Sequence, residues 1–484
     1  MNFLRYTNLS VGVTLWFSGC HSPGGVIPTT ESGSSDATGL ESSTRTTGDL
    51  TTGGTASGTS SEGSANPTSE DTTDSTTEGP AIGCTPSPWP DGYPEVFRKR
   101  IGFKVSKNNL TESLPDFPLL VVLPPSIDGT TFTDETTGKI LFTDAQGSTL
   151  SHEFEETPPV PQGTVDPTCD DRARNVWVKT TLENDEDTCL YMYFDREDLK
   201  PDNMVDPADV WSAGFKYVWH INSGPGDSFK NSRLPNGDDV VECVQGSSQV
   251  ECYNDATDQQ PWPTACLNGS ACRNVSGFGD HIGLNLVDDF SGPMTVSFWW
   301  NRWNTDADGD AQIAFGALTV SSSNCPSTHP CRDAETVQDG NFYFGIADDV
   351  YFGGVYDGSA ADKLIPPGDY AMKDWHNIAI TRDADNQLDF CVDGQCYEGS
   401  TVPMSSIGAI CLGGDWHGDK VPSMSTGVVG SNSIYLVDEI QMSDLVRTEA
   451  WLRASYLNRW CPGVFGQESD CAFIEFSPSV ENRP

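Results

Sequence analysis

Two neighbouring runs indicate the fold most clearly: Trp375-His376-Asn377-Ile378-Ala379-Ile380-Thr381-Arg382 and, after a short gap, Leu388-Asp389-Phe390-Cys391-Val392-Asp393-Gly394-Gln395. Both runs are short and rich in β-branched and aromatic residues, which is typical of strands. The pair Asp393-Gly394 suits a two-residue type I′ turn. Because Cys391 and Cys396 flank that turn symmetrically, they face each other across the strands, and we predict a hairpin closed by a disulfide.

The same pattern continues on both sides of this hairpin. From Cys84 onward, strand-like runs alternate with clusters of Pro, Gly, Asn and Asp, and no long helical period appears. We therefore predict an all-β fold with two β-sandwich modules, at residues 84–205 and 211–460, and a disulfide-closed C-terminal tail at 461–484. In the first module, Phe117–Leu123 is a continuous apolar run that is typical of a buried strand.

A first resemblance covers residues 92–200. They hold the segments FRKRIGFKV, FPLLVVL, ILFTDAQGSTLSHEFEE, VWVKT and CLYMYFD in that order. The order resembles a small bacterial domain of unknown function that precedes laminin-G-like modules in surface proteins. The resemblance implies architecture and location but no chemistry, because that domain has no established activity. Residues 158–172, which hold Cys169, are an insertion in the pattern, and we expect Cys189 to close it.

A second resemblance rests on four ordered segments, which are Met294–Trp300, Trp375–Arg382, Leu388–Gln395 and Val437–Ser443. With Tyr217–His220 as an opening strand and a short helix at Thr448–Tyr456, they resemble the concanavalin A-like, laminin-G-like family. The resemblance implies a jelly roll whose edge loops bind ligands. It also implies that Asp438 and Glu439 are structural residues of the last strand and not catalytic ones.

The N-terminus is typical of an export signal. Arg5 precedes a short apolar core, and Phe17-Ser18-Gly19-Cys20 follows it. This ending resembles the lipobox of bacterial lipoproteins, which implies a signal peptide at 1–19, lipidation of Cys20, and a location at the bacterial outer membrane or cell surface. The alternative is a plain secretory signal. Residues 21–83 are dominated by Thr, Ser and Gly and hold no aromatic residue, so we expect residues 20–83 to be a disordered tether.

Charge excludes one class of partner. The chain has 70 Asp and Glu against 27 Lys and Arg, which gives a formal net charge of −43. Such a chain repels a phosphate backbone, and we predict no nucleic-acid binding. No apolar run approaches the ~20 residues that span a bilayer. Membrane contact is therefore expected through the N-terminal lipid anchor alone.

The 15 cysteines indicate an oxidising compartment. If Cys20 is lipidated, the remaining cysteines are even in number and can all pair. The alternative, a metal or redox cluster, is disfavoured because no CxxC pair of the kind that zinc sites use repeats in the sequence. Proximity in the sequence favours four further pairs, which are Cys243 with Cys252, Cys266 with Cys272, Cys325 with Cys331, and Cys461 with Cys471.

One acidic cluster is a candidate calcium site. Asp306, Asp308 and Asp310 alternate along the chain around a glycine. Alternating carboxylates of this kind can wrap Ca²⁺, which is the one cofactor that the sequence suggests. The alternative is an ordinary acidic β-turn.

One loop is a candidate carbohydrate site. Asp415, Trp416 and His417 combine a carboxylate, an aromatic ring and an imidazole between two glycines. This combination suits stacking against a sugar ring with polar contacts beside it. The alternative is a Gly-rich turn with a half-buried Trp.

The sequence holds no GxSxG, HExxH or P-loop motif. The acidic run His152-Glu153-Phe154-Glu155-Glu156 lies in the first module and has the wrong alternation for the catalytic strand of a glucanase. We therefore predict a non-catalytic cell-surface protein, not an enzyme, that binds carbohydrate or a surface protein through its lectin-like module. The alternatives are a structural or adhesion protein of the envelope with no small ligand, and a divergent polysaccharide hydrolase.

Overall fold

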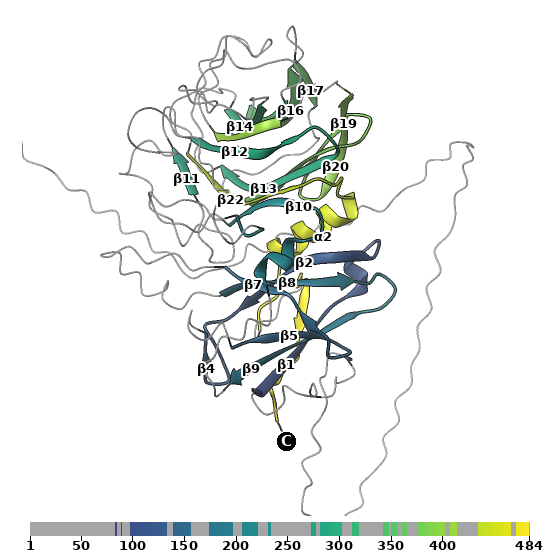
Figure 1. Ribbon diagram of the computed structural model, residues 1–484, viewed down its shortest axis with the longest axis vertical. Helices are drawn as coiled ribbons and strands as arrows, with labels where there is room; N and C mark the ends of the chain where they lie inside the picture. Colours follow the sequence, from purple (N-terminus) through teal and green to yellow (C-terminus); the bar gives the residue numbers. More distant parts are fainter. Residues whose placement is uncertain are drawn as a thin grey trace, which may run out of the picture. The chain divides into compact units, whose positions relative to one another are not determined.

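The computed structural model describes residues 83–84, 89, 97–132, 139–155, 174–196, 206–220, 231–233, 273–276, 281–302, 312–318, 342–347, 350–356, 361–364, 375–401, 407–413, 434–465 and 471–483. They belong to one compact unit, Glu78–Pro484 (Figure 1). The predicted signal peptide, the lipidation site Cys20 and most of the predicted tether lie outside the described residues.

The prediction of an all-β fold in two modules is confirmed. The strands pair in antiparallel ladders, and one α-helix and two 3-10 helices accompany them in the described part of the chain. The first module packs two sheets on a common core of Phe103, Phe142, Leu119 and Val178. The strands of its larger sheet are β1 (Phe97–Val105), β9 (Thr188–Arg196), β5 (Leu141–Asp144) and β6 (Thr149–Leu150). Those of its smaller sheet are β2 (Leu114–Leu123), β8 (Arg174–Leu182) and β7 (His152–Phe154).

The C-terminal tail completes the first module. Strands β23 (Ile474–Phe476) and β24 (Glu481–Asn482) both pair antiparallel with β1. Arg100 of β1 forms an ion pair of 2.7 Å with Glu481. The second module is therefore an insertion between β9 and β23, and the chain leaves the first module and returns to it.

The second module has two antiparallel sheets, which Figure 1 shows as stacked layers. The seven-stranded sheet holds β10 (Phe215–Trp219), β22 (Ile434–Ser443), β13 (Met294–Arg302), β18 (Trp375–Arg382), β19 (Gln387–Val392), β20 (Gln395–Thr401) and β11 (Arg273–Ser276). The six-stranded sheet holds β12 (His281–Phe290), β21 (Ile407–Gly413), β14 (Gln312–Leu318), β15 (Phe342–Ala347), β16 (Val350–Tyr356) and β17 (Ala361–Leu364).

The β19–β20 hairpin has the predicted type I′ turn. Asp393 and Gly394 both have positive φ, at 54° and 74°, as that turn requires. A Cβ on Gly394 would lie 2.3 Å from the Cα of Arg453, so the turn lies directly against helix α2 (Glu449–Trp460). A side chain at this position is therefore excluded by both the backbone conformation and the packing.

Helix α2 lies between the two modules (Figure 1). Thr448 caps its N-terminus by accepting a hydrogen bond from the Trp451 N–H. Trp451 and Leu452 pack in the same apolar core as Phe117 of the first module and Ala379 of the second. The modules therefore share one continuous core.

The described disulfides are Cys84–Cys189, Cys391–Cys396 and Cys461–Cys471. The last two are pairs expected from the sequence. The expectation that Cys189 closes the insertion that holds Cys169 is wrong, because Cys189 pairs with Cys84, 105 residues earlier. Spacing in the sequence does not reveal this bond, because Cys84 and Cys189 become neighbours only when β9 folds against the segment that leads into the module. Cys169 itself lies outside the described residues.

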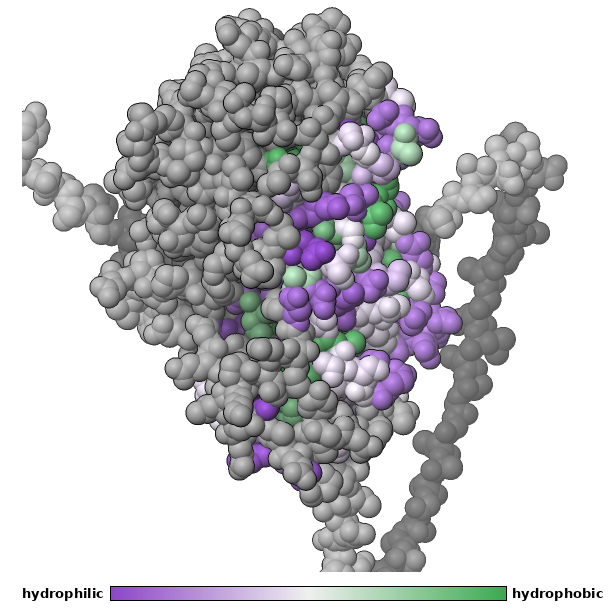
Figure 2. Space-filling view, viewed as in Figure 1, coloured by the Kyte–Doolittle hydropathy of each residue, from purple (hydrophilic) through white to green (hydrophobic). Residues whose placement is uncertain are grey.

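On the face in Figure 2, hydrophilic residues cover most of the described surface. The exposed large apolar side chains of the described residues are Leu445 and Val446, at 47% and 41% exposure. They adjoin one another after β22. The large apolar side chains of the described residues therefore lie mainly in the interior, including the layer around α2.

Candidate functional site

The predicted ligand sites lie outside the described residues. These are the calcium candidates Asp306, Asp308 and Asp310, the loop residues Asp415, Trp416 and His417, and the cysteines Cys243, Cys252, Cys266, Cys272, Cys325 and Cys331. Each of them stays a prediction.

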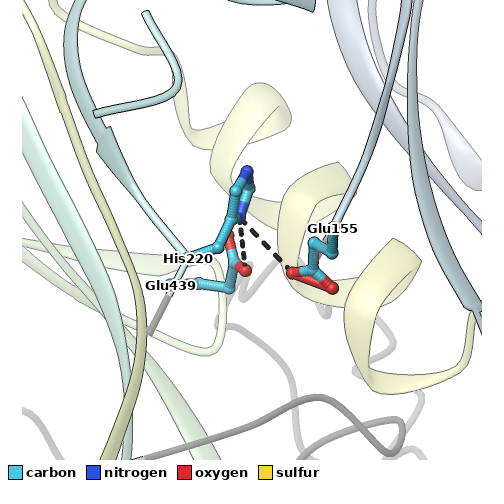
Figure 3. A group of neighbouring side chains, drawn as sticks. All are labelled: Glu155, His220 and Glu439. Atoms are coloured by element: carbon cyan, nitrogen blue, oxygen red, sulfur yellow. Dashed lines mark hydrogen bonds and ion pairs between the residues drawn. The ribbon is translucent and has the colours of Figure 1, made fainter. Parts of the chain in front are cut away.

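The described residues bring together a different set, which we name the junction cluster: Glu153, Glu155, His220, Asp438, Glu439 and Arg459. It lies where the two modules meet helix α2. Its centre is His220, which directly follows β10 and is 5% exposed. Figure 3 shows the carboxylates of Glu155 and Glu439 converging on the imidazole of His220.

Strand β7 and the residue that directly follows it supply two of the carboxylates, because side chains along an extended segment alternate between the faces of the sheet. The rings of His152 and Phe154 pack against each other, and His152 also contacts Phe142 in the first module. Glu153 and Glu155 project to the opposite side and reach His220. The indole N–H of Trp211 donates a hydrogen bond to Glu153 Oε2 and holds this carboxylate in place.

A bulge in β22 supplies the other two carboxylates. The ladder between β13 and β22 shifts register between the pairs Ser297–Gln441 and Trp299–Asp438, and Glu439 has a φ of 49°. Consecutive side chains of a regular strand point to opposite faces, but here Asp438 and Glu439 both reach one guanidinium. A non-glycine residue in this conformation costs on the order of 1–3 kcal/mol and persists only where its surroundings hold it.

That guanidinium belongs to Arg459 of α2. Its Nη2 donates to Asp438 Oδ2 at 2.8 Å, and its Nη1 lies 3.4 Å from Glu439 Oε1 and 3.7 Å from Glu155 Oε1. Its Cζ lies 5.5 Å from the centre of the Trp177 ring. Burial alone would lower the pKa of Arg459, but the charges of Glu439, Asp438 and Glu155 raise it above its usual value.

His220 contacts three carboxylates. Its Nδ1 lies 2.7 Å from Glu439 Oε1 and 3.4 Å from Glu155 Oε1, and its Nε2 lies 3.4 Å from Glu153 Oε2. The ring stacks on Trp177 with centroids 5.8 Å apart. Burial alone would lower the pKa of His220, but the charges of Glu439 and Glu153 and hydrogen bonds to them raise it well above its usual value.

The junction cluster has more negative than positive charge. Among these six residues, four carboxylates face one guanidinium and one imidazole, so the carboxylates outnumber the cationic groups. Burial raises the pKa of Glu439, as does the charge of Glu155, whereas His220 and Arg459 oppose the shift. A buried surplus of this kind is costly unless protons or a cation neutralise it.

Several carboxylate oxygens of the cluster lack a hydrogen-bond partner. Both oxygens of Glu155 and Oε2 of Glu439 are buried without one, in side chains that are 6% and 1% exposed. Glu155, His220 and Glu439 form the one group among the described residues whose potential metal-ligand atoms all lie within 4.8 Å of one another. Among the described residues, these three are therefore the candidates to hold a cation.

A small cavity adjoins the cluster. Glu439 and Arg459 line it together with Trp177 of the first module, Asn377 and Trp299 of the sheet, and Ser455 of α2. It has about 20 Å³ of space for the centre of a water molecule. That is enough for one water.

The sequence named every residue of the junction cluster except Arg459 but did not bring the residues together. From the sequence alone, Glu153 and Glu155 belong to an acidic run without the alternation of a glucanase strand, His220 belongs to an opening strand, and Asp438 and Glu439 form a structural pair. One local signal pointed to the site. The alternation of His152 and Phe154 with Glu153 and Glu155 marks a strand whose second face carries two acids.

Comparisons with known proteins give no family. No protein-family model matches the chain, and neither does any curated protein sequence. The chain is similar to the solved receptor binding domain of botulinum neurotoxin D, with a TM-score of 0.35 and 10% identity over 50% of this chain and 52% of that one. It is also similar to the serotype D ligand binding domain in complex with N-acetylneuraminic acid, with a TM-score of 0.33 and 10% identity over 50% of each chain. These scores are too low to indicate a function.

The helices also bear on membrane insertion. In the part of the chain that the structure describes, no helix combines the length and the apolar character needed to cross a membrane. The predicted anchor at Cys20 lies outside that part.

Proposed function

We propose that this chain is an exported, non-catalytic binding protein that is anchored through Cys20 and uses its larger β-sandwich to bind carbohydrate at the bacterial cell surface. The observation that carries the proposal is the insertion of the second module into the first. The Cys84–Cys189 disulfide ties the entering segment to β9, and β23 and β24 return to β1. Both ends of the folded unit therefore belong to the first module, which leaves the second module free to meet a ligand.

The junction cluster supports a non-catalytic role. A glycosidase places two carboxylates on either side of a bond in a polysaccharide that enters a cleft. The carboxylates that converge here are buried between the modules, with Glu155 at 6% and Glu439 at 1% exposure. A polymer does not reach them while α2 holds Asp438 and Glu439 through Arg459.

The ligand class follows from residues and not from the fold, because sandwiches of this kind serve many functions. The predicted platform of Asp415, Trp416 and His417 offers an aromatic face with polar groups beside it. Sugars are bound by such combinations, since their C–H faces stack on rings and their hydroxyls need polar partners. The predicted calcium residues Asp306, Asp308 and Asp310 are a second element of the proposal.

A glycan array with the full chain tests this function, in calcium and again in chelator, with thermal melts in parallel. We expect saturable binding that Trp416→Ala reduces at least tenfold. The matched control is Tyr397→Ala, which removes a half-buried aromatic side chain from β20. The calcium part of the proposal requires that Asp308→Asn abolishes any effect of calcium on binding and on the melting temperature.

Absence of binding in both buffers would contradict carbohydrate recognition. It would leave the second candidate, an adhesion or structural protein of the envelope. One observation favours that candidate independently, because the continuous apolar core around α2 joins the two modules. Binding that Trp416→Ala and Tyr397→Ala reduce equally would contradict the predicted platform.

A further inference from the structure

We propose that Glu155, His220 and Glu439 form a binding site for one divalent transition-metal ion of the Zn²⁺ class, which cross-links the two modules. Glu155 directly follows β7 of the first module. In the second module, His220 directly follows β10, and Glu439 lies in β22. This inference is independent of the proposed carbohydrate binding.

The first argument is the surroundings of Glu155. A buried carboxylate normally accepts hydrogen bonds at both oxygens. Glu155 accepts none at either oxygen, and its Oε1 lies 3.4 Å from His220 Nδ1 and 3.7 Å from Arg459 Nη1. Oε2 of Glu439 is also buried without a partner. These buried carboxylate oxygens, together with the imidazole of His220, are a set of donor atoms that a bound cation would satisfy.

The second argument is geometry. Ligand atoms at 2.0–2.2 Å from a tetrahedral zinc ion lie about 3.4 Å from one another. The distance between His220 Nδ1 and Glu155 Oε1 is 3.4 Å, and all the ligand atoms of the group lie within 4.8 Å of one another. A small movement of Glu439, whose Oε1 lies 2.7 Å from the same nitrogen, completes the set.

The third argument is the residue behind the imidazole. A metal-binding histidine usually donates its other ring N–H to a carboxylate, which fixes the tautomer. Glu153 Oε2 lies 3.4 Å from His220 Nε2 and is itself held by the indole N–H of Trp211. Glu153 is therefore a positioning residue for Nε2, so that Nδ1 faces the two other proposed ligands, Glu155 and Glu439.

The donor set also decides the kind of ion. One imidazole nitrogen with two carboxylate oxygens suits Zn²⁺ and neighbouring first-row ions, whereas Ca²⁺ takes six to eight oxygens. A divalent ion bound to neutral His220 compensates more of the surplus negative charge than a proton on the imidazole does. Arg459 stays paired with Asp438 at 2.8 Å and is not displaced.

The test is zinc titration of the full chain after removal of metals with a chelator. Calorimetry is run in excess Ca²⁺ and moderate salt, which suppresses weak binding to the acidic surface. We expect one tight equivalent of Zn²⁺ with a Kd at or below about 1 µM and a raised melting temperature, because an ion that binds the folded chain stabilises it. We expect His220→Gln and Glu155→Gln to weaken binding at least 100-fold, and Glu153→Gln to weaken it by about 10- to 100-fold.

His376→Gln is the matched control. It removes another largely buried histidine that pairs with a carboxylate, because His376 Nδ1 lies 2.8 Å from Asp393 Oδ2. Zinc affinity should not change in this variant. An equal loss in all variants, or tight binding that survives in both His220→Gln and Glu155→Gln, would overturn the site.

A measurement on the unmodified chain keeps the test valid if a variant fails to fold. X-ray absorption of the zinc-loaded protein should show a first shell of nitrogen and oxygen at about 2.0–2.2 Å with an imidazole signature. A shell that contains sulfur, or no stoichiometric zinc at all, would refute the proposal.

Discussion

The interior of the first module and the junction between the modules each bury a histidine, in opposite surroundings. His152 lies between the rings of Phe142 and Phe154, and burial lowers its pKa to about 4. His220 is at least as deeply buried, but carboxylates from two modules raise its pKa well above the usual value in spite of burial. Burial alone therefore does not set the charge of a histidine, because the charges brought by neighbouring elements decide the outcome.

The same contrast holds for the two faces of β7. His152 and Phe154 occupy an apolar interior, which gains stability from packing. Glu153 and Glu155 occupy the junction, where they lie beside His220 and Arg459 of other elements. One short strand thus links an ordinary core to an unusually charged interface.

The largest expected effect separates these two kinds of interior. Arg459→Met should lower the free energy of unfolding by about 3–5 kcal/mol, because it removes the guanidinium from the buried carboxylates of Asp438, Glu439 and Glu155. Urea unfolding at pH 7 measures the change.

The control for this variant is an exposed pair in the same chain. Lys216→Met breaks an ion pair of 3.0 Å with Asp444 in which both side chains are 43% exposed, and it should cost less than about 1 kcal/mol. Equal losses in the two variants would mean that the junction cluster compensates its charge without Arg459.

The next effect concerns the apolar histidine. Because the pKa of His152 is about 4 in the folded chain and near 6.5 in the unfolded chain, the unfolded state binds the proton more strongly. The contribution to stability is complete above pH 6.5 and is lost as the pH falls towards 4, by on the order of 3 kcal/mol. His152→Phe should remove this part of the pH dependence, as urea unfolding of both proteins between pH 7 and 4 would show. Parallel curves for the two proteins would contradict the assignment.

The contrast also explains how much the sequence predicts. The hairpin with Asp393-Gly394 and the Cys391–Cys396 disulfide was predictable, because turn and bond depend on residues next to one another. The Cys84–Cys189 bond was not, because it joins residues 105 positions apart. No local rule reports which strands become neighbours.

The junction cluster has the same origin. His220 and Glu439 are separated by 219 positions and meet only because β10 pairs with β22. The bulge that turns Glu439 toward Arg459 leaves no mark in the sequence, since a non-glycine residue occupies a left-handed conformation there. The sequence did hold the alternating acids Glu153 and Glu155, in β7 and directly after it, and this part of the site depends on local periodicity.

The smallest effect asks whether the junction is a core or a contact between independent modules. Asn458 of α2 bonds the outer edge of β2 twice, since its Nδ2 donates to Leu120 O at 2.9 Å and its Oδ1 accepts from Leu120 N at 2.7 Å. Asn458→Ala should lower the free energy of unfolding by about 2 kcal/mol, because two buried backbone groups lose their partners. Asn109→Ala, which removes one bond of 3.4 Å to Phe473 O, should cost far less.

The shape of the unfolding curve gives the sharper result. If the layer around α2 is a true core, Asn458→Ala shifts a single transition to lower urea and leaves its slope unchanged. If the modules are independent, the variant separates the curve into two transitions, one for each module. The second outcome would contradict the continuous core that joins Phe117, Trp451 and Ala379. It would also remove the reason to expect that a metal ion at the junction stabilises both modules together.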